Sequence, residues 1–193
     1  MISKEEIEFL KESNAIEREY SKEALEDAIK AWKYARRRGN LIKIDINYIS
    51  KIHELLMKRL YPRIAGKIRD IPIYVGTYQS CKEQMKPEKI MDALQKLVNP
   101  ALNPILSEEW IRKWHVKFES IHPFEDGNGR VGRILMNMQR LRLGLPLLII
   151  HEGPEQNEYY EWFSEDDKKY KSCTVPRGQY CSKHGVIHKA DVA

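Results

Sequence analysis

The segment 122–133 gathers side chains that are suited to phosphate chemistry. His122 is the residue of this segment that can take a proton near neutral pH without a large shift of its pKa. Asp126 supplies a hard carboxylate of the kind that Mg²⁺ binds alongside phosphate oxygens. Arg130 and Arg133 lie three positions apart, so both can lie on one side of a helix, and their planar guanidinium groups suit phosphate oxygens. Together they predict a site that holds a polyphosphate and activates a hydroxyl.

The backbone of the same segment favours a turn that leads into a helix. Pro123 disfavours continuation of a preceding helix. Gly127, Asn128 and Gly129 tolerate positive φ and leave their N–H groups unobstructed. An amphipathic pattern follows at once, and a helix N-terminus with free N–H groups attracts anions through hydrogen bonds and through its dipole. The turn is therefore predicted to bind phosphate oxygens.

Apolar residues that recur three and four positions apart predict the helices that must hold this segment. Ser3 and Glu6 have the spacing of a capping box, and Asp45 and Ser107 can cap later helices. The fold class is therefore predicted to be all-α. The predicted helices begin at or near Ser3, Ser21, Asp45, Pro87, Ser107 and Gly129.

One stretch, 66–78, departs from helical periodicity. Ile71, Ile73 and Val75 alternate with other residues, and glycines bound the stretch, which predicts a strand. Pro72 lacks an N–H group and marks an edge strand. The helical domain is therefore expected to carry one small β-hairpin with an open edge.

Composition limits the class of protein. The chain has 193 residues, a net charge of +5 and 42% apolar residues, which fits one domain of medium size. No apolar stretch is long enough to span a bilayer, and the charged first residues do not form a signal peptide. Three cysteines do not make a disulfide framework, so a cytoplasmic protein without membrane contact is expected. The basic patch 36–38 fits a solvated helix end better than a nucleic-acid site.

The segment 122–133 resembles the signature of the Fic family, His-x-Phe-x-Asp/Glu-Gly-Asn-Gly-Arg-x-x-Arg, and matches every specified position. The resemblance implies a Fic-type helical bundle that transfers AMP from ATP to a Tyr, Ser or Thr hydroxyl of a target protein. It implies that His122 deprotonates the acceptor, that Asp126 binds Mg²⁺, and that Phe124 anchors the loop. The residues that would hold the phosphates are Gly127, Asn128 and Gly129 in an anion hole, with Arg130 and Arg133 beside it.

The resemblance also assigns roles outside the signature. The predicted hairpin stands where Fic proteins have a flap, so the protein substrate is expected to dock on the 71–75 flap by strand addition. A purely structural hairpin is the alternative. Tyr159 and Tyr160 resemble the tyrosine pair that lies beside the adenine, with core packing as the alternative.

The sequence Ser13-Asn14-Ala15-Ile16-Glu17 resembles the inhibitory motif of the family, Ser/Thr-x-x-x-Glu-Gly/Asn. By this resemblance Glu17 pairs with Arg133 and takes the space that the γ-phosphate needs, because a carboxylate and a phosphate compete for the same guanidinium. Arg18 replaces the usual Gly or Asn. An ordinary exposed glutamate is the alternative for Glu17.

The expected organisation has three parts: residues 1–20 as an inhibitory helical segment, 21–163 as the Fic domain, and 164–193 as a polar, loosely structured tail. A zinc site is an alternative for the tail, although its cysteines are spaced more widely than in typical structural zinc sites. That site would consist of Cys173, Cys181, His184 and His188.

Two further histidines lie on predicted helices, His115 beside Trp114 and Phe118, and His53 among apolar neighbours. Both are predicted to be hydrogen-bonded core residues rather than catalytic groups.

Two other interpretations of function stay open. A Fic-type protein can use another nucleotide or remove AMP, because nucleotide choice depends on contacts outside the signature. A nucleotide-binding regulatory module without catalysis is the second, but a pure binding site has no need of a base at His122. The sequence does not give the target protein, the acceptor residue type or the oligomeric state.

Overall fold

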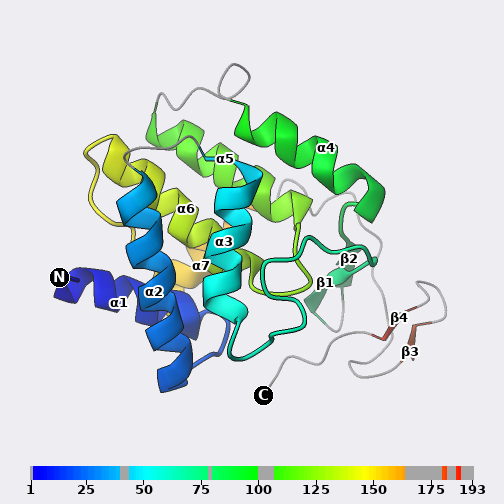
Figure 1. Ribbon diagram of the computed structural model, residues 1–193, viewed down its shortest axis with the longest axis horizontal. Coiled ribbons are helices and arrows are strands. Elements are labelled where there is room, and N and C mark those ends of the chain that lie inside the picture. Colours follow the sequence, from blue (N-terminus) through cyan, green and yellow to red (C-terminus); the bar gives the residue numbers. More distant parts are fainter. Residues whose placement is uncertain are drawn as a thin grey trace.

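The computed structural model describes residues 2–39, 44–77, 80–99, 107–163, 180–181 and 186–187. This part of the chain is mainly helical, as predicted, with two small antiparallel sheets (Figure 1). The helices are α1 (Lys4–Ala15), α2 (Lys22–Gly39), α3 (Ile46–Met57), α4 (Pro87–Val98), α5 (Glu108–Ile121), α6 (Asn128–Arg142) and α7 (Pro154–Glu161). The strands are β1 (Tyr74–Thr77), β2 (Ser80–Glu83), β3 (Tyr180–Cys181) and β4 (Val186–Ile187).

Side chains cap the helices where the sequence predicts. Ser3 and Glu6 form the reciprocal capping box that opens α1. The Asp45 carboxylate accepts the Tyr48 N–H at 2.7 Å, and the Ser107 hydroxyl opens α5 in the same way. Each such cap stabilises a helix by about 1 kcal/mol. Helix α3 ends at Met57, and Lys58 is its C-cap residue.

The most deeply buried helix is α6, which runs through the middle of the bundle (Figure 1). It packs against α1, α2, α3 and α5. Most of its apolar side chains join the main core with Trp32, Ile52 and Phe118, none of which is exposed, and Met136 joins a second, smaller cluster. Because neighbours surround α6, its first turn is held at a fixed place, and that turn carries the signature residues.

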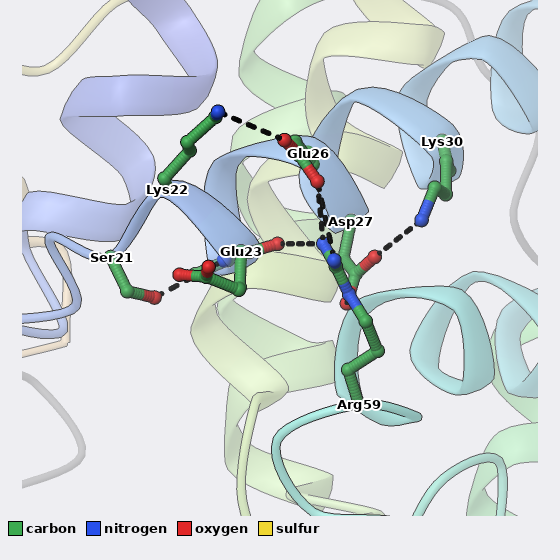
Figure 2. A network of polar contacts seen from close by, with 8 residues as sticks. Ser21, Lys22, Glu23, Glu26, Asp27, Lys30 and Arg59 are labelled. Carbon is green, nitrogen blue, oxygen red and sulfur yellow. Dashed lines mark hydrogen bonds and ion pairs between the residues drawn. The ribbon is translucent and has the colours of Figure 1, made fainter.

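An ion-pair network ties α2 to the residues just after α3 (Figure 2). The buried carboxylate of Asp27 accepts from Arg59 Nε at 2.8 Å and from Lys30 Nζ at 2.9 Å. Arg59 also donates to Glu26 and to the Glu23 carbonyl. The network therefore fixes the C-terminal end of α3, the helix that presents two side chains to the signature loop.

The hairpin is present, but its first strand begins later than the sequence predicted. Strand β1 pairs with β2 from Tyr74 opposite Glu83 to Thr77 opposite Ser80. Ile71 precedes the strand, and its carbonyl accepts from an arginine side chain instead of a neighbouring strand. The contact with arginine explains why the strand begins after Ile71. Alternating apolar residues indicate which side chains are buried, but they do not show which group each main-chain carbonyl binds.

Some sequence predictions concern residues that the structure does not describe, and one helix of the structure was not predicted. The zinc hypothesis for the tail and most of 164–193 lie outside them. Helix α7 was not predicted, although Pro154 at its first turn is a typical start signal. Among the described helices, none is both long and apolar enough to cross a bilayer.

Candidate active site

The N-terminus of α6 has no side-chain cap. Gly127 occupies the N-cap position with φ 76°, a left-handed conformation that suits glycine, and it has no side chain with which to cap the helix. Its own N–H donates to the Asp126 carboxylate at 2.7 Å. The next N–H groups, those of Asn128, Gly129 and Arg130, are the unpaired donors of a first helical turn. Such donors are suited to phosphate oxygens, and the phosphate cradle stays a prediction.

Tertiary contacts hold the signature loop in shape. The Phe124 ring is buried and stacks on His53, with ring centroids 3.8 Å apart and planes 2° apart. His53 Nδ1 accepts the Gly66 N–H at 2.9 Å, so the proton lies on Nε2, which donates to the Asp126 carbonyl at 3.0 Å. Burial lowers the pKa of His53 to about 4, which keeps this neutral tautomer. The prediction of a hydrogen-bonded core histidine is confirmed.

The side chain of Asn128 binds the backbone of the signature loop. Its Oδ1 accepts the Phe124 N–H at 2.9 Å, and its Nδ2 donates to the Phe124 carbonyl at 2.9 Å. Both ends of the amide are therefore bound to the backbone of Phe124, and the place of Asn128 in the anion hole stays a prediction. What Asn128 offers to a phosphate in this arrangement is its main-chain N–H.

His122 ends α5 in a left-handed conformation, with φ 50° and ψ 64°. The imidazole Nδ1 lies 3.3 Å from the Glu119 carbonyl, which can only accept, so this contact places the proton on Nδ1. The Nε2 atom then keeps its lone pair. Burial lowers the pKa of His122 to about 4, so the ring is neutral near pH 7 and able to accept a proton.

Arg69 is a site residue that the sequence analysis missed. Its side chain is 3% exposed and donates to the carbonyls of His122, Ile71 and Met85 at 2.7, 2.8 and 2.5 Å. Its main-chain N–H donates to the Pro123 carbonyl at 2.9 Å. Burial lowers the pKa of Arg69 from its ordinary value. One side chain therefore connects the signature loop to both ends of the hairpin.

Arg130 is buried without a carboxylate partner among the residues that the structure describes. Its Nη2 atom lies 3.3 Å from the Met57 sulfur, and its Nε has no hydrogen-bond partner in the described part of the chain. A buried guanidinium group is stable only with an anion or acceptor nearby. The arrangement suits the predicted contact with a phosphate oxygen.

Arg133 has its acceptors already, and they come from the N-terminal segment. Its Nε donates to Ser13 Oγ at 2.9 Å, and its Nη2 donates to Glu17 Oε1 at 2.7 Å and to the Ser13 carbonyl at 2.8 Å. Burial alone would lower the pKa of Arg133, but Glu17, Tyr159 and Glu119 together outweigh it, so the pKa is raised. The predicted contact between Glu17 and Arg133 is therefore present.

The Glu17 carboxylate also lies directly above the first turn of α6. A Cβ atom placed on Gly129 would lie 2.2 Å from Glu17 Oε1 and 3.0 Å from Arg133 Nη1. Only a glycine leaves room for a carboxylate at this point. Arg18 follows with φ 55°, the conformation for which the family pattern has Gly or Asn at this position.

The two tyrosines do not lie in the same environment. Tyr159 is 4% exposed, packs in a core with Ile111 and Met136, and shares a hydrogen bond of 2.8 Å with His115 Nε2. For Tyr159 the core-packing alternative describes this structure. Tyr160 is exposed, and its contact with a base stays a prediction.

Glu119 and His115 of α5 lie against Gly132 of α6. A Cβ atom on Gly132 would lie 2.1 Å from Glu119 Oε1 and 2.8 Å from His115 Cε1, so both side chains press against this glycine. Burial raises the pKa of Glu119 to about 8 and lowers the pKa of His115 to about 3. Both groups are therefore mainly neutral at pH 7. The core role predicted for His115 is confirmed, whereas Glu119 was not singled out.

In the described part of the chain, side chains alone do not form a resident metal site. Among the described residues, no three His, Cys, Asp or Glu side chains lie close enough to hold an ion. Mg²⁺ commonly binds through one or two carboxylates together with substrate phosphates. The Asp126 carboxylate, which accepts the Gly127 N–H beside the cradle, fits that arrangement.

Comparison with known proteins identifies the family. Residues 43–139 match the model of the Fic/DOC family, and the chain belongs to it. The matched range includes α3, the hairpin, α5 and most of α6, which together carry the signature loop and the residues that brace it. The N-terminal segment with Glu17 lies outside the matched range.

Individual relatives agree with this assignment. Protein adenylyltransferase fic-1 of Caenorhabditis elegans is 32% identical over 118 residues, which cover 61% of this chain and 23% of that protein. The chain therefore spans about a quarter of the length of this curated relative.

Two solved structures support the fold. A Fic domain containing signaling protein of Bacteroides thetaiotaomicron has a TM-score of 0.73 at 22% identity, covering 87% of this chain and 74% of that one. BepC of Bartonella tribocorum, solved with bound AMPPNP, has a TM-score of 0.52 at 21% identity, covering 63% and 66%.

Proposed function

We propose that this protein transfers AMP from ATP to a hydroxyl group of a target protein, and that Glu17 restrains the transfer. The observation that carries the proposal is the combination of a neutral imidazole at His122, a helix N-terminus without a side-chain cap, and a buried Arg130 that has no carboxylate partner among the described residues. The name of the C. elegans relative, a protein adenylyltransferase, supports the same chemistry.

The residues would act in a defined order. The acceptor hydroxyl donates its hydrogen bond to Nε2 of His122, and its proton moves to that nitrogen as the oxygen attacks the α-phosphorus. The bond between the α-phosphorus and its bridging oxygen to the β-phosphate breaks, and pyrophosphate leaves. N–H groups of the α6 first turn and Arg130 stabilise the charge on the phosphate oxygens.

ATP with Mg²⁺ is the nucleotide that fits the site. The AMPPNP bound to BepC supports an adenine nucleotide triphosphate. Asp126 would hold the Mg²⁺, which neutralises phosphate charge when bound. Arg133 would bind the γ-phosphate once Glu17 leaves it.

The hairpin would present the protein substrate. Its edge is proposed to pair with an extended target segment, which brings the acceptor hydroxyl toward His122. The link through Arg69 places the hairpin ends next to the signature loop, which supports this role.

The proposed organisation has three parts, residues 1–20, 21–163 and 164–193. A cytoplasmic location is proposed as well.

Inhibition would follow from direct competition. The Glu17 carboxylate takes Arg133 Nη2 and the space above Gly129, and a γ-phosphate needs the same partners. The ion pair between Glu17 and Arg133 is stable, because breaking it without a replacement would leave the buried arginine unpaired. Nucleotide in a productive position therefore requires Glu17 to move.

The test uses ATP labelled at the α-phosphate, Mg²⁺ and a lysate as the source of acceptors. We expect weak protein labelling by the wild type, stronger labelling by Glu17→Gly, and none by Glu17→Gly with His122→Ala. Labelling that survives the loss of the imidazole would overturn the mechanism. ATP binding by folded Glu17→Gly protein with no transfer to any acceptor would favour a regulatory nucleotide-binding module.

A further inference from the structure

Arg69 has an unusual set of partners for a buried charge. Its guanidinium group donates to three main-chain carbonyls, and no acidic side chain is recorded as its partner among the described residues. The three carbonyls belong to separate parts of the chain: His122 in the signature loop, Ile71 before β1 and Met85 after β2. Five N–H donors in a fixed plane make such a three-way connection feasible for arginine, whereas lysine has a single nitrogen.

The partner in the signature loop is the carbonyl of the candidate base itself. His122 has φ 50°, and residues other than glycine reach this region only where the surroundings hold them. Arg69 Nε binds the His122 carbonyl at 2.7 Å, and Arg69 N–H binds the next carbonyl, that of Pro123. The His122 N–H is fixed from the other side by Phe118. The conformation that aims the imidazole thus depends on Arg69 at one end and on α5 at the other.

We propose that Arg69 is a positioning residue that holds the His122 imidazole and the substrate-presenting hairpin in one rigid frame. The proposal rests on the proposed function. It assigns Arg69 no contact with ATP or with the acceptor. Arg69 would instead fix the distance between the His122 imidazole and the acceptor hydroxyl that the hairpin presents.

The nucleotide cradle is built without Arg69. The first turn of α6, Arg130 and Arg133 have other neighbours, which are Phe124, Met57 and the N-terminal segment. Loss of the Arg69 side chain should therefore leave ATP binding in place while transfer to the acceptor falls. A merely structural arginine would instead affect both, because a collapsed loop would carry the cradle with it.

The experiment compares Arg69→Lys and Arg69→Met with a matched surface arginine, Arg63→Met, all in the Glu17→Gly background. Arg63 has a side chain that is 79% exposed, and it pairs with Glu125 of the same loop. ATP affinity is measured by equilibrium binding, and kcat and KM are measured for transfer to a labelled acceptor. Hydrogen–deuterium exchange is followed in peptides that cover 118–126 and 80–86.

We expect ATP affinity within about twofold of the parent for both Arg69 variants and a loss of transfer of about 10- to 100-fold, the size that a small misplacement of a catalytic group produces. Arg63→Met should match the parent in both measurements. Exchange should rise in the signature loop and at the hairpin ends together. If Arg69→Met does not fold, Arg69→Lys, which keeps the charge and loses the three-way connection, decides the matter.

Three results would overturn the proposal: full transfer by a folded Arg69 variant, ATP affinity that falls in step with transfer, or exchange that rises in only one of the two segments. Failure of the proposed function looks different. In that case the Glu17→Gly parent itself gives no transfer, and the exchange measurement still tests the connection through Arg69.

Discussion

Glu17 and Arg133 are 116 positions apart in sequence, yet Glu17 Oε1 lies 2.7 Å from Arg133 Nη2 above the first turn of α6. The arginine is buried, with a side chain 2% exposed, whereas the glutamate side chain is 36% exposed. One partner is therefore fixed in the core, and the other is a partly exposed side chain. This asymmetry makes the contact suitable for release, because only the exposed partner has to move.

Removing the Glu17 carboxylate should strengthen ATP binding. Glu17→Gln keeps the size of the side chain and weakens the charged pair, so we expect ATP affinity to rise by about 10- to 100-fold, the usual range for one coupled contact. Equilibrium binding of ATP with Mg²⁺ is the measurement. Glu19→Gln is the matched control, since Glu19 Oε1 accepts from the nearby Ser21 N–H and, within the described ranges, from no other donor. Equal affinities for wild type and Glu17→Gln would contradict direct competition.

Local signals in the sequence were sufficient for α1 to α6 and for the signature loop, whereas α7 was not predicted. Ser3, Asp45 and Ser107 act as caps because their partners lie three residues away, within reach of a pattern. The contact of Glu17 with Arg133 was also predicted, but from the resemblance to the inhibitory motif of the family and not from residues that are neighbours in the sequence.

The residues that were missed depend on tertiary contacts. Arg69 binds carbonyls, which every residue carries, so no side-chain pattern marks it. The Asn128 amide binds the backbone of Phe124, a contact that the signature pattern does not reveal. Glu119 meets Gly132 from another helix, and such a contact is visible only after α5 and α6 are packed.

Arg18 should be a site where a smaller residue stabilises the protein. Its φ of 55° is unfavourable for a residue with a Cβ atom by about 1–2 kcal/mol, whereas glycine is flexible in the unfolded chain. We expect Arg18→Gly to raise the free energy of unfolding by up to about 1 kcal/mol, measured by urea denaturation. Arg37→Gly, an exposed position inside α2, should do the opposite and destabilise by about 0.5–1 kcal/mol. The same sign for both variants would contradict the explanation.

Gly132 should not accept a side chain while Glu119 is present. A Cβ atom there would lie 2.1 Å from Glu119 Oε1, so we expect Gly132→Ala to destabilise the protein by about 1–3 kcal/mol. Glu119→Ala removes the atom that clashes and should restore part of that loss in the double variant. The measurement is a double-mutant cycle of unfolding free energies. Additive effects of the two substitutions would show that the carboxylate is not what excludes the methyl group.

The pH dependence of stability should have a maximum near pH 6.5. Folding lowers the pKa of His53 to about 4, of His115 to about 3 and of His122 to about 4, from an ordinary value of 6.5. Below pH 6.5 the unfolded chain therefore takes up protons that the folded protein refuses, and stability falls toward pH 4. Glu119 acts in the opposite direction, because its folded pKa of about 8 means that the unfolded chain has lost a proton which the folded protein keeps.

Between pH 4.5 and 8 the Glu119 effect makes stability fall as pH rises, at up to about 1.4 kcal/mol per pH unit. Below pH 6.5 three histidines outweigh one carboxyl group, so the net slope changes sign there. Urea denaturation at pH 5, 6.5 and 8 measures both limbs. Glu119→Gln should flatten the limb from pH 6.5 to 8 and leave the acid limb in place, because the amide does not titrate. A wild-type protein that is as stable at pH 8 as at pH 6.5 would show that Glu119 is ionised in the folded state and that its carboxylate has found a partner beside Arg133.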